Sequence, residues 1–93
     1  VDMKSGAPAF GTPEYIRAKQ MTGQMARFDK IPLRASNACA SNAPDAQATW
    51  ESSNSLWSAI SGGINMVYHG AGWLEGGLVS SFEKFVIDFI LIP

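Results

Sequence analysis

The sequence predicts an α/β fold made of about three consecutive βα units with parallel strands. Short apolar segments typical of strands alternate with longer segments of helical periodicity. Helix starts at Pro13 and Pro44, and strand starts at Ile31 and Ile64, recur at intervals of roughly 30 residues, the length of one βα unit. In residues 64–91 a strand, a glycine-rich loop and a helix follow one another directly.

The first unit is expected to open with a short strand over residues 1–5 and a Gly/Pro-rich loop over residues 6–11. Thr12 then caps a helix whose first position is Pro13, where the missing N–H costs nothing. Apolar residues at helical spacing form one stripe that is predicted to face a sheet: Ala18, Met21, Met25 and Phe28.

The second unit is predicted to contain a strand over residues 31–35, in which Pro32 indicates an edge position or a strand start. A polar loop over residues 36–42 follows it. Pro44 marks the next helix start, and Asp45 suits the positive end of the helix dipole. The expected inner stripe of this helix is Trp50, Ser53, Trp57 and Ile60, before Gly62 and Gly63 end it.

The third unit is the clearest one. A strand over residues 64–68 leads into the loop 69–79, and Ser80 with Glu83 fits a capping box at the start of the last helix. The pattern of this helix predicts a strongly amphipathic face made of Phe82, Phe85, Val86, Phe89 and Ile90.

Composition excludes several function classes. The 93 residues, enough for one small domain, carry a net charge of −1 and no basic patch, so nucleic-acid binding is not expected. Cys39 and His69 are the only residues of their types, which excludes an internal disulfide and a zinc site and favours the reducing cytoplasm. No signal peptide or membrane span is recognisable. The low charged fraction, 16%, indicates apolar surface that a partner covers, so we expect a homo-oligomer.

The candidate binding residues lie where strands are expected to end. His69 follows the third strand directly, at the edge where parallel α/β folds bind ligands, and its imidazole can donate a hydrogen bond. Tyr68, Trp73 and Phe10 offer aromatic faces, which bind quaternary ammonium groups with roughly 0.5–2 kcal/mol per contact. The alternative for each ring is packing in a core or interface, and for His69 it is a satisfied structural histidine.

Other polar residues carry weaker signals. Glu75 and Glu83 look like a pair of carboxylates for acid–base catalysis. The predicted capping box already gives Glu83 a structural role, and Glu75 is expected to be a solvated charge in a loop, so such catalysis has little support. Cys39 has no adjacent base to activate it as a nucleophile. The end of the second strand carries Arg34, Ser36 and Asn37, which are placed at the same mouth, although an arginine there is also a common salt-bridge partner. The loop from Gly70 to Gly77 lacks the glycine spacing of a dinucleotide fingerprint.

Residues 65–88, NMVYHGAGWLEGGLVSSFEKFVID, closely resemble the trimethylamine methyltransferase family of corrinoid-dependent enzymes, and the resemblance continues through residues 3–14 and 44–48. It implies transfer of a methyl group from a quaternary or tertiary methylamine to a corrinoid (cobalamin) carried by a partner protein, with no cofactor bound directly. No pyrrolysine occurs in the chain, so the glycine betaine branch is the nearer analogy. In that branch a strand-end histidine helps to hold the substrate carboxylate, and His69 is the matching position.

The family fold is a (β/α)8 barrel, which needs roughly 250 residues, so the resemblance implies that residues 1–93 are one part of a barrel domain. The chain departs from the family after Val-Ile-Asp, where residues 89–93, FILIP, replace an acidic pattern. Activity of the 93-residue chain alone is therefore not expected. The alternative function is a non-catalytic α/β module that self-associates through edge strands and apolar helix faces.

Overall fold

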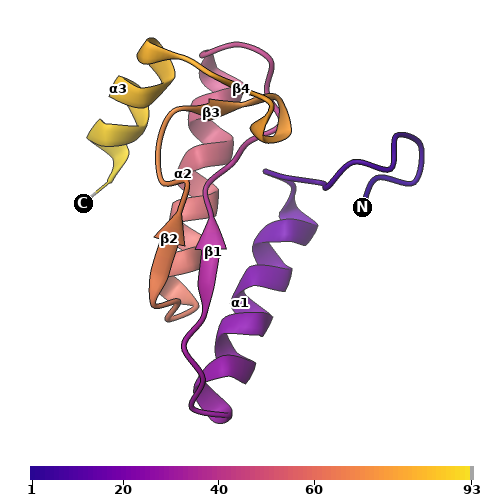
Figure 1. Ribbon diagram of the computed structural model, residues 1–93, viewed down its shortest axis with the longest axis vertical. Coiled ribbons are helices and arrows are strands. Elements are labelled where there is room, and N and C mark those ends of the chain that lie inside the picture. Colours follow the sequence, from indigo (N-terminus) through magenta and orange to yellow (C-terminus); the bar gives the residue numbers. More distant parts are fainter. Residues whose placement is uncertain (93) are drawn as a thin grey trace.

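The computed structural model describes residues 1–92 and has a mixed α/β fold (Figure 1). In chain order its elements are α1 (Pro13–Phe28), β1 (Arg34–Ser36), α2 (Ala46–Ser61), β2 (Met66–Tyr68), β3 (Trp73–Leu74), the 3-10 turn η1 (Glu75–Gly77), β4 (Val79–Ser80) and α3 (Phe82–Leu91). β1 and β2 pair in parallel, with Ala35 opposite Val67, which confirms the predicted parallel strands.

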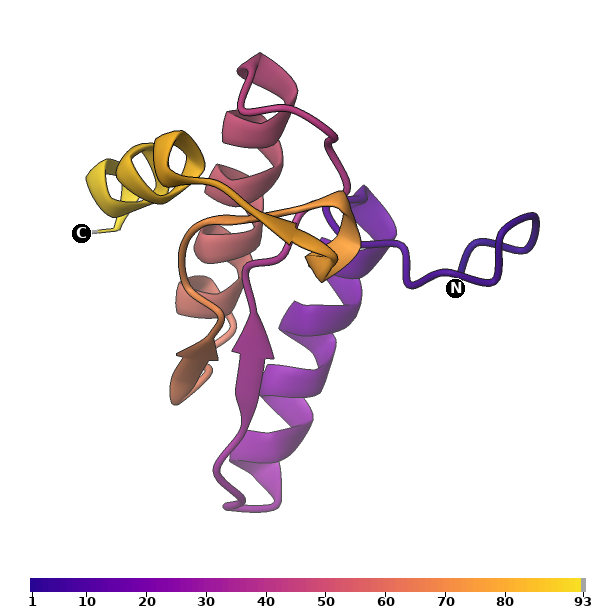
Figure 2. The same cartoon turned by 45° about the horizontal axis from the view of Figure 1, so that its top comes forward.

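Both parallel strands are shorter than predicted and begin later. Leu33 accepts backbone hydrogen bonds from Asn65 and Met66, and its own N–H donates to the Asn65 side chain, so ladder pairing begins only at Arg34. The strand expected over residues 1–5 is wrong: this segment is a turn, closed by a hydrogen bond from the Ser5 hydroxyl to Asp2. Residues 1–8 are exposed and extend away from the helices in both views (Figures 1 and 2).

The first helix begins with the predicted Thr12 cap, and the second begins two residues after the predicted Pro44, with Asp45 as its cap. The Thr12 hydroxyl accepts a hydrogen bond from the Tyr15 N–H at 3.2 Å, and Pro13 occupies the first helical position. The Asp45 carboxylate accepts from the Ala48 N–H at 3.1 Å, and this bond lowers the pKa of that carboxyl. Asp45 is thus the N-cap of α2, and Pro44 precedes the helix.

The third cap differs from the prediction by one residue. Ser81, not Ser80, is the N-cap of α3, and its hydroxyl accepts from the Lys84 N–H at 3.0 Å. Ser80 instead pairs with Trp73 in the antiparallel hairpin of β3 and β4. The capping box is therefore wrong, since Glu83 lies one position too early to reach back to the cap. Glu83 remains in the first turn, where a carboxylate suits the helix dipole.

The three helices bury the opposite faces from those predicted. Met21, Met25 and Phe28 on α1 are exposed, as are the apolar residues of the other two stripes: Trp50, Trp57, Ile60, Phe82, Phe85, Val86, Phe89 and Ile90. The buried faces are polar or small instead. They comprise Lys19 and Gly23 on α1, Lys84 and Asp88 on α3, and a row along α2 formed by Ala48, Glu51, Ser52, Ser55, Leu56, Ser58 and Ala59.

Small residues and internal hydrogen bonds explain this inversion. The helices α1 and α2 cross where Gly23 meets Gly62, so closely that a Cβ at position 23 would lie 2.3 Å from the Gly62 carbonyl oxygen. The Lys19 ammonium donates to the carbonyls of Ser36 (2.8 Å) and Ser55 (3.1 Å). Polar groups therefore enter the interior with partners, which removes most of the cost of burying them.

The glycine-rich loop contains an unpredicted antiparallel hairpin, β3 and β4, which lies across the C-terminal ends of β1 and β2 (Figures 1 and 2). Its Leu74 joins Cys39 and Ala48 in a small buried apolar cluster. The hairpin thereby places the loop residues against the edge at which both parallel strands end. Among residues 1–92, no helix has the length and apolar character needed to cross a membrane.

Candidate functional site

Three of the four predicted binding residues meet beyond the end of β2. The rings of Tyr68 and His69 have centroids 4.2 Å apart, and those of His69 and Trp73 are 5.3 Å apart at an interplanar angle of 77°. His69 therefore lies between the two aromatic rings. Its backbone has a φ of 54°, in the left-handed region that histidine tolerates better than most residues, and this turn directs the chain from β2 into the loop.

A cation already occupies one face of the cluster. The Arg34 guanidinium carbon lies 4.9 Å from the centroid of the Tyr68 ring, so Arg34, at the start of β1, stacks on that aromatic face. One face of Tyr68 is therefore already covered by a positive charge, as cation–π contacts allow. Ser36, at the end of β1, accepts from Lys19 through its carbonyl and turns its hydroxyl to the Ala38 N–H.

Phe10, the fourth predicted residue, lies elsewhere. Its ring packs edge-on against Tyr15, with centroids 5.3 Å apart. It also approaches the turn η1, because a Cβ at Gly76 would lie 3.8 Å from the Phe10 ring. Within residues 1–92 we find no ring contact between Phe10 and the three clustered residues. The structure therefore does not bring Phe10 to the same place.

Trp73 lines two hollows. A small one of about 50 Å³ is lined by Ala38, His69, Trp73 and Gly77. A larger groove of about 400 Å³ is lined by Ala71, Gly72, Trp73, Ser80, Ser81, Phe82 and Phe85. Ligand sites usually have roughly 300–1,000 Å³. The groove has that size and is mostly apolar, while the small hollow holds no more than part of a ligand.

The remaining polar candidates have structural partners. The Cys39 thiol donates to the Trp73 carbonyl at 3.2 Å, and burial raises the pKa of that thiol, which opposes a role as nucleophile. The Glu75 N–H donates to the Ser41 carbonyl, and Glu75 has a φ of 51°, so its position is set by the turn. No cluster of three metal-ligating side chains occurs among residues 1–92.

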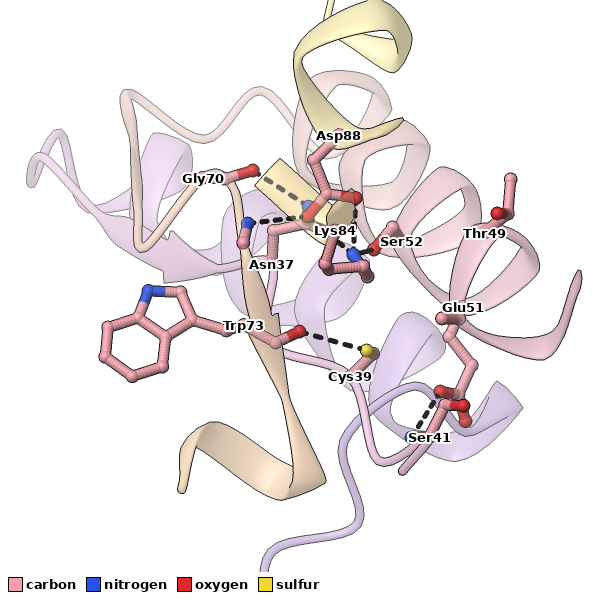
Figure 3. Close-up of polar contacts among 12 residues, drawn as sticks. Asn37, Cys39, Ser41, Thr49, Glu51, Ser52, Gly70, Trp73, Lys84 and Asp88 are labelled. Carbon is pink, nitrogen blue, oxygen red and sulfur yellow. Dashed lines mark hydrogen bonds and ion pairs between the residues drawn. The ribbon is translucent and has the colours of Figure 1, made fainter. Parts of the chain in front are cut away.

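Of the polar groups that hold the loop, sequence reasoning named Asn37 but missed Lys84 and Asp88; Figure 3 shows all three. The Asn37 amide donates to the Gly70 carbonyl at 2.9 Å, and the Asp88 carboxylate accepts from the Gly72 N–H at 2.9 Å. Lys84 forms a buried ion pair with Asp88 and also donates to the hydroxyl of Ser52. The spacing of Lys84 and Asp88, four residues apart on one helix, was the available signal.

Comparison with known proteins gives consistent matches over nearly the whole chain. The family profile of trimethylamine methyltransferase (MTTB) matches residues 1–92. Over 88 residues the chain is 39% identical to the glycine betaine methyltransferase of Desulfitobacterium hafniense (strain Y51). It is 33% identical to trimethylamine methyltransferase MttB of Methanosarcina thermophila and 32% identical to the proline betaine:corrinoid methyltransferase of Eubacterium limosum. Each match covers 94% of this chain but 18% of the relative, so the chain spans less than a fifth of those proteins.

Proposed function

The chain belongs to the trimethylamine methyltransferase family, and we propose that the complete protein containing it transfers a methyl group from a quaternary or tertiary methylamine to a corrinoid protein. In this reaction a C–N bond of the amine breaks, the methyl group passes to the corrinoid of the partner, and nitrogen keeps the electron pair. The corrinoid supplies the methyl acceptor. The residues of this chain bind and orient the amine.

The observation that carries this proposal is the position of His69 between the rings of Tyr68 and Trp73, beyond the ends of two parallel strands. A trimethylammonium group has no N–H to donate, so aromatic faces are its best partners in a protein. The Arg34 contact on Tyr68 supports cation binding at this cluster. We assign Tyr68 and Trp73 to the ammonium group.

His69 would then bind the other end of a betaine. Its imidazole N–H can donate to a carboxylate, and a hydrogen bond to a charged group contributes about 1.5–3 kcal/mol. Glycine betaine carries its carboxylate next to the trimethylammonium group, so both ends can be reached from one cluster. We propose a glycine betaine-like substrate, consistent with the 39% identity to a glycine betaine methyltransferase.

We also propose that residues 1–93 form consecutive βα units of a (β/α)8 barrel domain. The parallel pair β1 and β2, with α2 between them in sequence, supports this arrangement, and the binding cluster lies at the strand end that such barrels use. We also propose a cytoplasmic location, because the single cysteine, Cys39, is a free, buried thiol, as is usual in a reducing compartment.

Replacement of His69 tests the substrate assignment. We choose His69→Gly because glycine adopts the φ of 54° without strain. In the complete protein, calorimetry should show glycine betaine binding weakened about 10- to 100-fold through the lost hydrogen bond. Choline, which keeps the trimethylammonium group but has a hydroxyl in place of the carboxylate, should bind nearly as before. Equal losses for both ligands would mean that His69 is structural.

Glu75→Gly is the matched control. Glu75 lies in the same loop and has a similar φ of 51°, but its side chain has no aromatic ring and takes no part in the cluster. It should leave the affinity for both ligands unchanged. Unchanged binding of glycine betaine by His69→Gly would remove His69 from the site altogether.

The second candidate function is a non-catalytic module that self-associates. The observation in its favour is the exposure of the apolar helix faces, with Trp57 68% and Phe82 91% exposed. Exposed apolar surface on this scale usually marks a contact with another protein segment. Absence of methylamine binding together with tight self-association would favour this alternative.

A further inference from the structure

We propose that Asp88, with its ion-pair partner Lys84, is a positioning residue that fixes the segment between His69 and Trp73. The inference rests on the proposed function for its link to substrate, and on the geometry alone for its effect on the loop. Asp88 lies on α3, outside the aromatic cluster, and holds the loop by accepting a hydrogen bond from the Gly72 backbone N–H.

The segment is held on both sides of Ala71. On one side the Gly70 carbonyl, next in sequence to His69, accepts from Asn37 at 2.9 Å. On the other side the N–H of Gly72, which precedes Trp73, donates to Asp88 at 2.9 Å. The carbonyl of Gly72 accepts in turn from the Ser81 N–H at 3.1 Å. The backbone that sets the direction of the His69 and Trp73 side chains is therefore fixed at three points.

Asp88 can do this because Lys84 holds its carboxylate in place. Both side chains are essentially inaccessible, with exposures of 0% for Lys84 and 1% for Asp88. The Lys84 ammonium contacts both carboxylate oxygens and the hydroxyl of Ser52 (Figure 3). A carboxylate bound in this way has a fixed orientation, and it presents one oxygen to the Gly72 N–H.

Energetics argue that the pair does more than stabilise the fold. Taking two charges out of water costs several kcal/mol per ion, and replacing a buried pair by apolar residues of similar volume is often neutral or stabilising. A pair of apolar side chains would fill the same space between α2 and α3. It would, however, leave the Gly72 N–H without its acceptor, so the oxygen of residue 88 is what the loop requires.

Two double variants of the complete protein isolate that oxygen. Lys84→Met with Asp88→Asn removes both charges but keeps an acceptor for the Gly72 N–H, and Lys84→Met with Asp88→Leu removes the acceptor at nearly the same volume. By hydrogen exchange, peptides covering residues 69–74 should exchange about three- to tenfold faster in the Leu variant than in the Asn variant, as expected for one lost neutral hydrogen bond. This readout needs no ligand.

Binding and turnover supply the second readout. Glycine betaine should bind several-fold more weakly to the Leu variant than to the Asn variant, and the substrate concentration for half-maximal rate should rise with little change in the maximal rate. A general folding defect would instead lower the maximal rate at an unchanged half-saturating concentration.

Several outcomes overturn the inference. Equal exchange of residues 69–74 in the two variants would show that Asp88 does not hold the loop. Faster exchange with equal betaine binding would show that the fixed loop does not serve the site. Failure of the Leu variant, or of both variants, to fold would make the pair structural. If the wild-type protein binds no methylated amine, the proposed function fails, while the exchange measurement still decides whether Asp88 fixes the loop.

Discussion

The contact between α1 and α2 gives a prediction in which two effects of opposite sign compete. Gly23→Ala should favour helix formation by about 1 kcal/mol, because alanine is the better helix former. The new methyl group, however, would lie 2.3 Å from the Gly62 carbonyl oxygen, whereas an ordinary contact is 3.4–4 Å. Because the neighbour is backbone and not a flexible side chain, the two helices must separate.

The steric effect should win. Overpacking of this kind costs about 1–3 kcal/mol. The Arg27 guanidinium also donates to the same Gly62 carbonyl, at the end of α2, and a hydrogen bond to a charged group contributes about 1.5–3 kcal/mol. The steric cost and the lost hydrogen bond together amount to about 2.5–6 kcal/mol, which exceeds the gain of about 1 kcal/mol in helix propensity. We therefore expect Gly23→Ala to lower the free energy of unfolding by about 1.5–5 kcal/mol.

Chemical denaturation of the complete protein, followed by hydrogen exchange in peptides from α1 and α2, measures this change. Gln24→Ala is the matched control, since the next residue of the same helix is exposed and should change stability by less than about 0.5 kcal/mol. A Gly23→Ala protein as stable as the wild type, or more stable, would refute the close approach of the helices.

The remaining predictions concern the last cap, a buried amine and association. Ser81→Ala should destabilise α3 by about 1 kcal/mol in thermal melting, whereas Ser80→Ala should have little effect. Burial lowers the pKa of Lys19 from 10.5 to about 8, so the unfolded chain binds more protons between these values; stability should rise with pH in that window, and a Lys19→Met variant should lack this rise. For the 93-residue chain on its own, the exposed apolar helix faces predict a homo-oligomer, and sedimentation of a stable monomer at high micromolar concentration would contradict this prediction.

The parts of the fold that depend on residues close together in sequence were predictable. Thr12 was predicted as a helix cap because a side-chain oxygen accepts from an N–H three residues later, and Asp45 was placed at a helix start by the helix dipole. Both effects are local in sequence. The last cap was misplaced because two serines are adjacent, and only the pairing of Ser80 with Trp73 decides between them.

The buried faces were not predictable, because periodicity identifies an apolar stripe but not what covers it. Burial of Glu51 depends on the N–H groups of Ala40 and Ser41, which donate to its carboxylate from a loop about ten residues away in sequence. Such partners leave no periodic trace in the sequence. The chain spans 18% of the length of its relatives, and we propose that the rest of the barrel covers the apolar stripes.

The candidate site was predictable where it lies next to a strand. Tyr68 and His69 end β2, and Trp73 follows within the same loop, so their clustering needs only one chain reversal. Phe10 was assigned on the assumption of a strand over residues 1–5. Without that strand its ring packs on Tyr15 and approaches Gly76, and it does not join the cluster.

Stability and binding should therefore separate at the pair of Lys84 and Asp88. Replacing this pair by methionine and leucine removes the desolvation cost of two buried charges, so thermal stability should stay the same or rise. The same change deprives the Gly72 N–H of its acceptor, so the loop that carries Trp73 should loosen and betaine affinity should fall. A site-holding role predicts these opposite signs, whereas a purely structural role predicts that both quantities fall together.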